Sequence, residues 1–116
     1  MKEIIVKTKY EKLVGLPIEV DKVSVSDGLI KHIQKRHPNM IRYIDDIGYI
    51  LNNPDYLGFN ANQPSDSFEC IKVLSDNVLV AVKLDSKNGY YYVASIYDVK
   101  DSKLAHMVRN GRLIRI

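Results

Sequence analysis

Hydrophobic positions change their spacing at Pro54, and this change predicts the order of the elements. Between Ser26 and Pro54 the apolar residues recur every three or four positions, as they do on the buried side of a helix. After Pro54 they fall in short runs of Val, Leu, Ile and Tyr separated by turn residues, which is typical of strands. The pattern therefore predicts helices first and a sheet after them.

A pair of helices is expected between residues 26 and 54. The first begins at Ser26, a good N-cap residue, and ends before Pro38. The second runs from about Met40 to Leu51, until Asn52-Asn53-Pro54 stops it. Residues 2 to 21 show no clean period, and we expect residues 1–23 to form an extended N-terminal arm and loop.

Short strands and one further helix are expected in the second half of the chain. Strands are predicted at residues 56–59, 68–74, 78–84 and 90–97, a helix from Asp101 through Val108, and an edge strand at 112–116. The links at residues 75–77 and 85–89 are short enough only for antiparallel hairpins. Because helices precede the sheet without β-α-β alternation, we expect an α+β fold. An N-terminal helix pair would pack on one face of a four- to five-stranded antiparallel sheet, followed by a short C-terminal helix, and the other face would meet a ligand.

Composition narrows the class of protein. A chain of 116 residues with 46% apolar and 27% charged residues is typical of one globular domain, which we place at residues 24–116. No apolar stretch is long enough to span a membrane, so we expect a cytoplasmic protein without a membrane partner. The net charge of +3 tolerates a polyanionic partner without requiring one. Cys70 stands alone and is expected to be a small buried hydrophobe.

The densest polar cluster lies at the end of the first helix and contains His32 and His37. On a helix these residues are roughly 140° apart, so His32 would face solvent or substrate and His37 the edge of the core. A spacing of five does not match the i,i+4 pairs that bind zinc, and we expect no metal site. An alternative is that Lys35, Arg36 and His37 only complement the negative end of the helix dipole.

Alternation along the predicted strands assigns side chains to faces. The run from Val78 to Leu84 has one apolar face and places Lys83 on the other. In the next run, strict alternation groups Tyr91, Val93, Ser95 and Tyr97 on one face and Tyr90, Tyr92, Ala94 and Ile96 on the other. Tyrosine suits base stacking, but it also suits half-buried strands, and these polar residues would equally fit a solvated face.

Several strings together resemble a known family. They are GLIKHIQKRHPN at residues 28–39, NPDYLG at 53–58, DNVLVAVKLD at 76–85, YVASIYD at 92–98 and GRL at 111–113. Over roughly residues 24–116 the chain resembles phage-associated nuclease domains of the Barnase-EndoU-colicin-RelE (BECR) class. The resemblance implies a ribonuclease fold that acts on RNA, either transfer or messenger RNA, without a metal or other cofactor. It also implies a toxin or mobile-element effector, with a cognate antitoxin or immunity protein as partner.

RNA cleavage through its own 2′-hydroxyl requires a base, an acid and cations around the phosphate. Given the resemblance, His32 and His37 are the acid–base candidates, Lys83 and Arg112 the phosphate ligands, and Ser95 and Tyr97 the positioning groups. Were His37 buried, Glu69 or Tyr97 would supply the second proton transfer. Candidates for RNA binding around this centre are Lys35, Arg36, Lys72, Lys103 and Arg109. Two other functions stay open, a non-catalytic RNA- or protein-binding module and a structural accessory of a mobile element.

Overall fold

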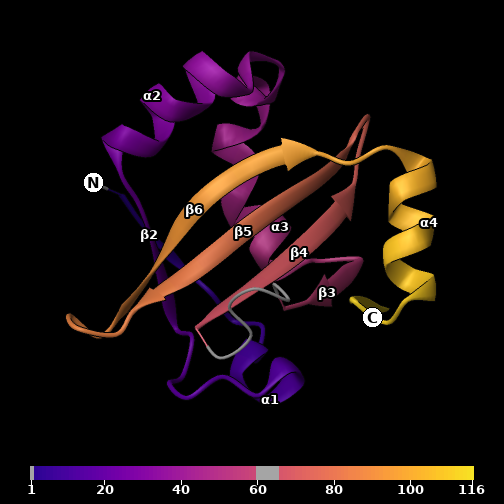
Figure 1. Cartoon of the computed structure of the whole chain (residues 1–116). Coiled ribbons are helices and arrows are strands. Elements are labelled where there is room, and N and C mark those ends of the chain that lie inside the picture. The colour runs from indigo at the N-terminus through magenta and orange to yellow at the C-terminus, as the bar shows by residue number, and fades with distance from the viewer. Residues whose placement is uncertain (1, 60–65) are drawn as a thin grey trace.

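The computed structural model describes residues 2–59 and 66–116. Within these ranges the strands form one seven-stranded sheet in the order β1-β2-β6-β5-β4-β3-β7 (Figure 1). The strands are β1 (Lys2–Ile5), β2 (Lys22–Val25), β3 (Tyr56–Gly58), β4 (Ser67–Val73), β5 (Asn77–Asp85), β6 (Tyr90–Asp98) and β7 (Leu113–Arg115). The helices are α1 (Tyr10–Val14), α2 (Asp27–Arg36), the 3₁₀ helix η1 (Pro38–Asp46), α3 (Ile47–Asn52) and α4 (Asp101–Arg109).

The α+β class is confirmed, but the predicted sheet of four to five antiparallel strands is wrong. The described part of the chain has seven strands, and β2 runs parallel to β6, with Val23 opposite Tyr91. The additional strands come from residues 2–25, where a loop-like arm was expected. There β1 pairs antiparallel with β2, and Tyr10 of α1 is fully buried. Short strands of four residues with mixed charge carry too weak an alternation to be recognised from sequence.

The predicted helix pair is correct only in its first member. Ser26 caps α2 as expected, because its Oγ accepts a hydrogen bond from the Leu29 N–H at 3.1 Å. The second helix is not continuous. Its first part is η1, which begins at Pro38, and only Ile47–Asn52 forms the α-helix α3. Apolar residues three and four apart fit a 3₁₀ turn as well as an α turn, so the spacing alone could not separate the two.

A β-bulge decides which side chains of β6 share a face. The pairing of β5 with β6 shifts between Ala81 and Val82, so that Ala81 lies opposite Ser95 while Val82 lies opposite Val93. An extra residue in one strand breaks strict alternation. As a result Tyr91 and Val93 join Ile96 in the core, which corrects the grouping expected from the sequence.

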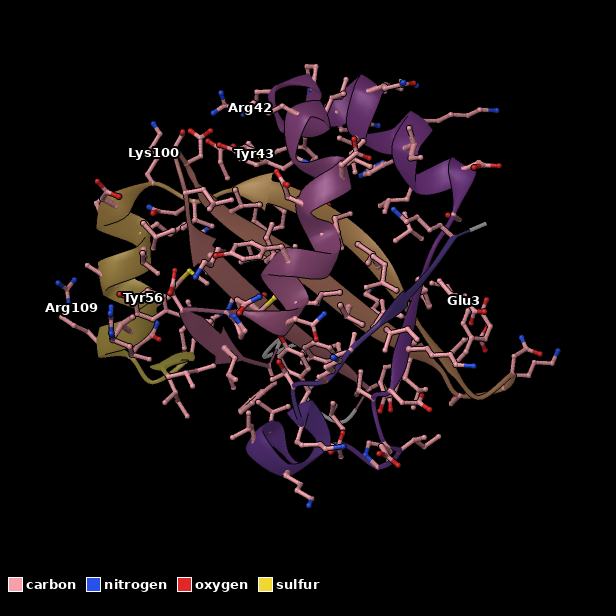
Figure 2. The ribbon with its side chains drawn as sticks, turned by 180° about the vertical axis from the view of Figure 1, so that it is seen from behind. Glu3, Arg42, Tyr43, Tyr56, Lys100 and Arg109 are labelled. Atoms are coloured by element: carbon pink, nitrogen blue, oxygen red, sulfur yellow. The ribbon has the colours of Figure 1, made fainter. Side chains whose placement is uncertain are left out.

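We call the two sides of β4, β5 and β6 the apolar face and the polar face. The apolar face carries Phe68, Cys70, Val80, Val82, Val93 and Ile96, which pack in the main core with residues of α1, α2, η1 and α3. Figure 2 looks onto this helix-covered side, whereas Figure 1 looks onto the other. The polar face carries Ser67, Glu69, Lys83, Tyr92, Ser95 and Tyr97.

Among the helices of residues 2–59 and 66–116, one covers an end of the polar face. There α4 adds Leu104 and Met107 to a smaller apolar cluster with Ile71 and Leu79. Tyr97, near the end of β6, borders this cluster. The part of β6 that precedes Tyr97 lies clear of α4 (Figure 1). None of the helices in the described ranges is both long enough and apolar enough to cross a membrane.

Candidate functional site

Two histidines meet at the end of α2, beside β6. His37 is the C-cap of this helix, and its backbone N–H donates to the Ile33 carbonyl at 2.8 Å. The centroids of the His32 and His37 rings lie 6.0 Å apart, and the His37 ring lies 5.9 Å from that of Tyr97. His32 is exposed and His37 is half-buried. The half-turn after the helix thus brings both imidazoles to the edge of the polar face.

Arg112 and Glu69 form the most buried ion pair in the described ranges. The Arg112 Nε donates to Glu69 Oε1 at 2.7 Å and its Nη2 donates to Oε2 at 3.1 Å. The Glu69 side chain is only 2% exposed, whereas that of Arg112 is 30% exposed. A guanidinium carries five N–H donors, so this bidentate contact leaves others that can bind a phosphate. Glu69 therefore holds a cation in place at the surface.

Tyr97 connects the histidines to this ion pair. Its ring lies beside His37, and its hydroxyl interacts with Arg112. Burial raises the pKa of Tyr97 and the nearby Glu69 carboxylate raises it further, while Arg112 acts in the opposite direction. The net rise keeps the hydroxyl protonated at neutral pH, so Tyr97 is a hydrogen-bond donor and not a base there.

Gly58 makes room for Arg112 next to Glu69. In the sheet Gly58 lies opposite Glu69 on one side and Leu113 on the other. A Cβ atom on Gly58 would lie 2.0 Å from the Arg112 carbonyl oxygen, far inside van der Waals contact. Any other residue at this position would push the Arg112 backbone away from β3, so Gly58 contributes to the placement of the ion pair.

Ser95 and Lys83 lie further along the polar face. Ser95 is opposite Ala81, which is itself opposite Glu69, so Ser95 is two strands away from the ion pair. Lys83 is two residues beyond Ala81, about 7 Å along β5. Among the described residues Lys83 makes no ion pair. The sheet thus holds a second cation at some distance from Arg112.

The residues expected to bind RNA around this centre do not gather on one surface. Lys35 and Arg36 are exposed on α2, next to the two histidines. Lys72 lies on the other side of the sheet, where its Nζ is 3.2 Å from Asp55 Oδ1. Lys103 and Arg109 are exposed on α4, and Arg109 projects away from the sheet (Figure 2). Of these five residues, Lys35 and Arg36 alone adjoin the histidines.

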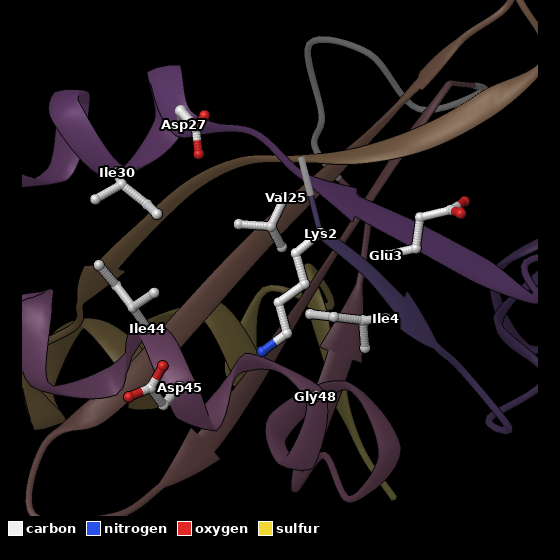
Figure 3. A pocket seen from close by; sticks show the side chains of 9 residues that line it. All are labelled: Lys2, Glu3, Ile4, Val25, Asp27, Ile30, Ile44, Asp45 and Gly48. Atoms are coloured by element: carbon white, nitrogen blue, oxygen red, sulfur yellow. The ribbon is translucent and has the colours of Figure 1, made fainter.

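A hollow of about 470 Å³ between β1, β2, α2, η1 and α3 lies away from all these groups. Its apolar lining comes from Ile4, Val25, Ile30 and Ile44, and its charged residues are Lys2, Glu3, Asp27 and Asp45 (Figure 3). Carboxylates outnumber the single ammonium group, so the hollow does not suit a phosphate. In the described part of the chain, no three His, Cys, Asp or Glu side chains are grouped so that they could hold a metal ion.

Sequence reasoning undervalued two residues of this arrangement. Glu69 entered only as a substitute proton donor or acceptor, although a carboxylate between Phe68 and Cys70 in an apolar strand signals a buried, paired charge. Gly58 entered only within a resembling string, although a glycine at the end of a short strand often marks a close backbone approach. The partner of each lies on β7 or immediately before it, which no local pattern reveals.

The fold and this cluster define a class of α+β protein in which a sheet face carries an arginine–carboxylate pair beside two imidazoles. Such groups suit chemistry on a phosphodiester. Residues 2–106 match the model of the family described as phage-Barnase-EndoU-ColicinE5/D-RelE like nuclease3. The chain belongs to this nuclease family, as its resemblance indicated, and the match begins before residue 24. No curated protein and no solved structure matched the chain.

Proposed function

We propose that the protein is an endoribonuclease that cleaves single-stranded RNA by attack of a 2′-hydroxyl on the adjacent phosphorus, without a metal ion. The observation that carries this proposal is the contiguous row His32–His37–Tyr97–Arg112 at the edge of the polar face. The family supplies nuclease chemistry in general. The row supplies what the RNA-specific reaction needs, namely two proton-transfer groups and a cation beside one another.

In the proposed reaction the 2′-oxygen forms a bond to phosphorus while the bond from phosphorus to the 5′-oxygen breaks. One imidazole of the pair accepts the 2′-hydroxyl proton, and the other donates a proton to the departing 5′-oxygen. Rings with centroids 6.0 Å apart can both reach a single phosphodiester, because the attacking 2′-oxygen and the departing 5′-oxygen lie on opposite sides of the same phosphorus. The products are a 2′,3′-cyclic phosphate and a 5′-hydroxyl.

Arg112 and Tyr97 would stabilise the charge that develops on the non-bridging oxygens. The N–H groups of Arg112 that Glu69 does not use and the Tyr97 hydroxyl are both donors held in advance. Lys83 is too far along β5 to share this phosphate and would bind a neighbouring one. Ser95, between them, would donate to the backbone that connects the two phosphates. Lys35 and Arg36 would bind RNA approaching from α2.

The test is cleavage of a mixture of single-stranded RNAs and transfer RNA by the purified protein in excess chelator. We expect products that end in 2′,3′-cyclic phosphate and 5′-hydroxyl, and no cleavage of the same strands with 2′-deoxyribose. His37→Gln should lower the rate about 100- to 10,000-fold, the usual contribution of a general acid or base. His106→Gln is the matched control, since His106 is exposed on α4. RNA left intact, or products with 5′-phosphates, would refute the proposal, and binding without cleavage would favour a non-catalytic module.

As a further part of this proposal, the protein acts as a toxin or mobile-element effector that a cognate inhibitor restrains. Its expression should then slow growth of a bacterial host, and His37→Gln should relieve the effect at equal protein level. Equal growth with the active and the substituted protein would contradict this role without affecting the chemistry.

A further inference from the structure

A second hollow lies on the same side of the sheet as the proposed catalytic row, near the opposite end of β6. It has a volume of about 180 Å³ and is lined by Ser24, Ser26, Asp85, Tyr90 and Tyr92. The register fixes its position, because Ser24 of β2 lies opposite Tyr92, and Tyr92 lies opposite Lys83. The hollow therefore adjoins Lys83, which makes no ion pair within residues 2–59 and 66–116.

The lining combines flat apolar surfaces with short hydrogen-bonding groups. The rings of Tyr90 and Tyr92 have centroids 6.1 Å apart at an interplanar angle of 54°, so their faces are not stacked on each other. Tyr90 is 39% exposed and Ser24 is 7% exposed. A planar, partly polar ring fits such a lining, since it can stack on tyrosine and bond with the hydroxyls.

The hollow and the adjoining Lys83 carry opposite charges and therefore suit different parts of a nucleotide. Asp85 lies in the lining and is held ionised, because hydrogen bonds from the side chain and backbone of Asn88 lower its pKa. A carboxylate repels a phosphate but accepts hydrogen bonds from amino groups. The ammonium group of Lys83, two residues before Asp85 on β5 and opposite Tyr92 of β6, suits the phosphate instead. Base and phosphate of one nucleotide thus find complementary groups side by side.

We propose that the hollow between Tyr90, Tyr92 and Asp85 binds one unpaired nucleobase of the RNA, while Lys83 binds its phosphate. This proposal rests on the proposed function for the identity of the strand, and it adds a base-selective subsite away from the cleaved bond. Because Asp85 accepts hydrogen bonds, the subsite prefers a base with an exocyclic amino group over uracil.

The experiment measures binding and not cleavage, using 2′-O-methyl hexanucleotides that cannot undergo the reaction. One strand is abasic throughout, and a second carries a single adenine on the same backbone. The wild-type protein should bind the one-base strand about 5- to 100-fold more tightly, as expected for stacking of one base. Tyr92→Ala should bind both strands with the affinity of the abasic one, and Tyr92→Phe should keep most of the preference.

Matched variants show whether the effect belongs to this hollow. Tyr49→Ala is the control, because Tyr49 is 54% exposed on α3, on the other side of the sheet. It should leave the preference intact. Replacing the adenine by uracil should weaken binding to the wild-type protein, and Asp85→Asn should reduce the difference between the two bases.

Three results would overturn the subsite. The first is an equal affinity of the wild-type protein for the one-base and abasic strands. The second is a Tyr92→Ala protein that keeps the full preference, and the third is a Tyr92→Ala protein that loses affinity for both strands alike. None of them depends on catalysis. A protein that shows the Tyr92-dependent preference but cuts no RNA would refute the nuclease proposal and leave the base site standing.

Discussion

The two faces of the central strands are made of alternating residues of the same segments, yet they treat polar groups differently. On the apolar face, Cys70, Val80 and Ile96 are fully buried, and the Tyr10 hydroxyl that enters this core donates to the Leu51 carbonyl at 2.6 Å. On the polar face, Glu69 is equally buried but its partner Arg112 reaches the surface. On the apolar face the polar groups bond with each other inside the core, whereas on the polar face they include a group exposed to solvent.

This difference teaches where stability and chemistry reside. Neighbours in sequence such as Glu69 and Cys70 lie on opposite faces, because side chains alternate along a strand. Substitutions on the apolar face should therefore alter the free energy of unfolding and leave the chemistry of folded molecules unchanged. Substitutions on the polar face should alter chemistry, and stability only where a buried charge is involved.

The largest effect is expected where the two properties overlap, at Arg112. Arg112→Gln leaves the Glu69 carboxylate buried without its ion-pair partner, which should lower the free energy of unfolding by about 3 kcal/mol. It should also abolish RNA cleavage, because the cation for the phosphate is lost. Urea denaturation measures the first effect, and the cleavage assay below the unfolding transition measures the second.

Glu69→Gln sharpens this prediction. It leaves the partly exposed Arg112 without its carboxylate, and solvent can compensate that charge better, so the loss of stability should be smaller. The double variant should regain part of the unfolding free energy that Arg112→Gln loses. It should not regain RNA cleavage, because the cation is still missing. Equal destabilisation by the two single variants would show that the burial of Glu69 does not determine the cost.

The elements on these faces differ in how far the sequence predicted them. The runs for β4, β5 and β6 had clear boundaries, and Ser26 marked the start of α2, because each signal is local. The bulge opposite Ala81 was not predictable, since it adds a residue without any change in composition. It moved Tyr92 onto the face that carries Ser95 and thereby created the second hollow.

The candidate cluster was predicted in part for the same reason. His32 and His37 were found as a dense polar segment, and Lys83 by alternation. The bidentate contact of Arg112 with Glu69 joins residues 43 positions apart, and the close approach of Gly58 to Arg112 depends on β7. Such pairings arise from the order of strands in the sheet, which a single sequence does not specify.

A smaller effect, confined to stability, is expected on the apolar face. Tyr10→Phe removes the hydroxyl that bonds with the Leu51 carbonyl but retains the ring stacked on Phe68 at 4.2 Å. The unsatisfied buried carbonyl should cost about 1–2 kcal/mol of unfolding free energy. Thermal or urea unfolding measures this cost. The rate of RNA cleavage per folded molecule should not change, and a large fall in that rate would undermine the separation of the two faces.

Two lysines on adjacent strands provide a weaker but closely matched comparison. Lys83→Ala should weaken binding to single-stranded RNA several-fold and reduce the slope of log affinity against log salt by about 0.7, as for one lost phosphate contact. Lys72→Ala should leave the slope unchanged, because Lys72 contacts Asp55 on the opposite side of the sheet. Fluorescence anisotropy over a range of salt concentrations measures both. Equal slopes for the two variants would remove Lys83 from the RNA path.

The smallest effect concerns Cys70, and it tests whether the apolar face stays closed. Burial raises the pKa of the Cys70 thiol to about 12, so at pH 8 the folded protein holds it as the unreactive neutral thiol. A thiol reagent should therefore label Cys70 only in molecules that open, and labelling should be slow in buffer and rapid in concentrated urea. Tyr10→Phe should accelerate labelling, because it weakens the same core, whereas Lys83→Ala should not. Rapid labelling of the native wild-type protein would show that this core opens freely, and the two faces could then no longer be treated as independent.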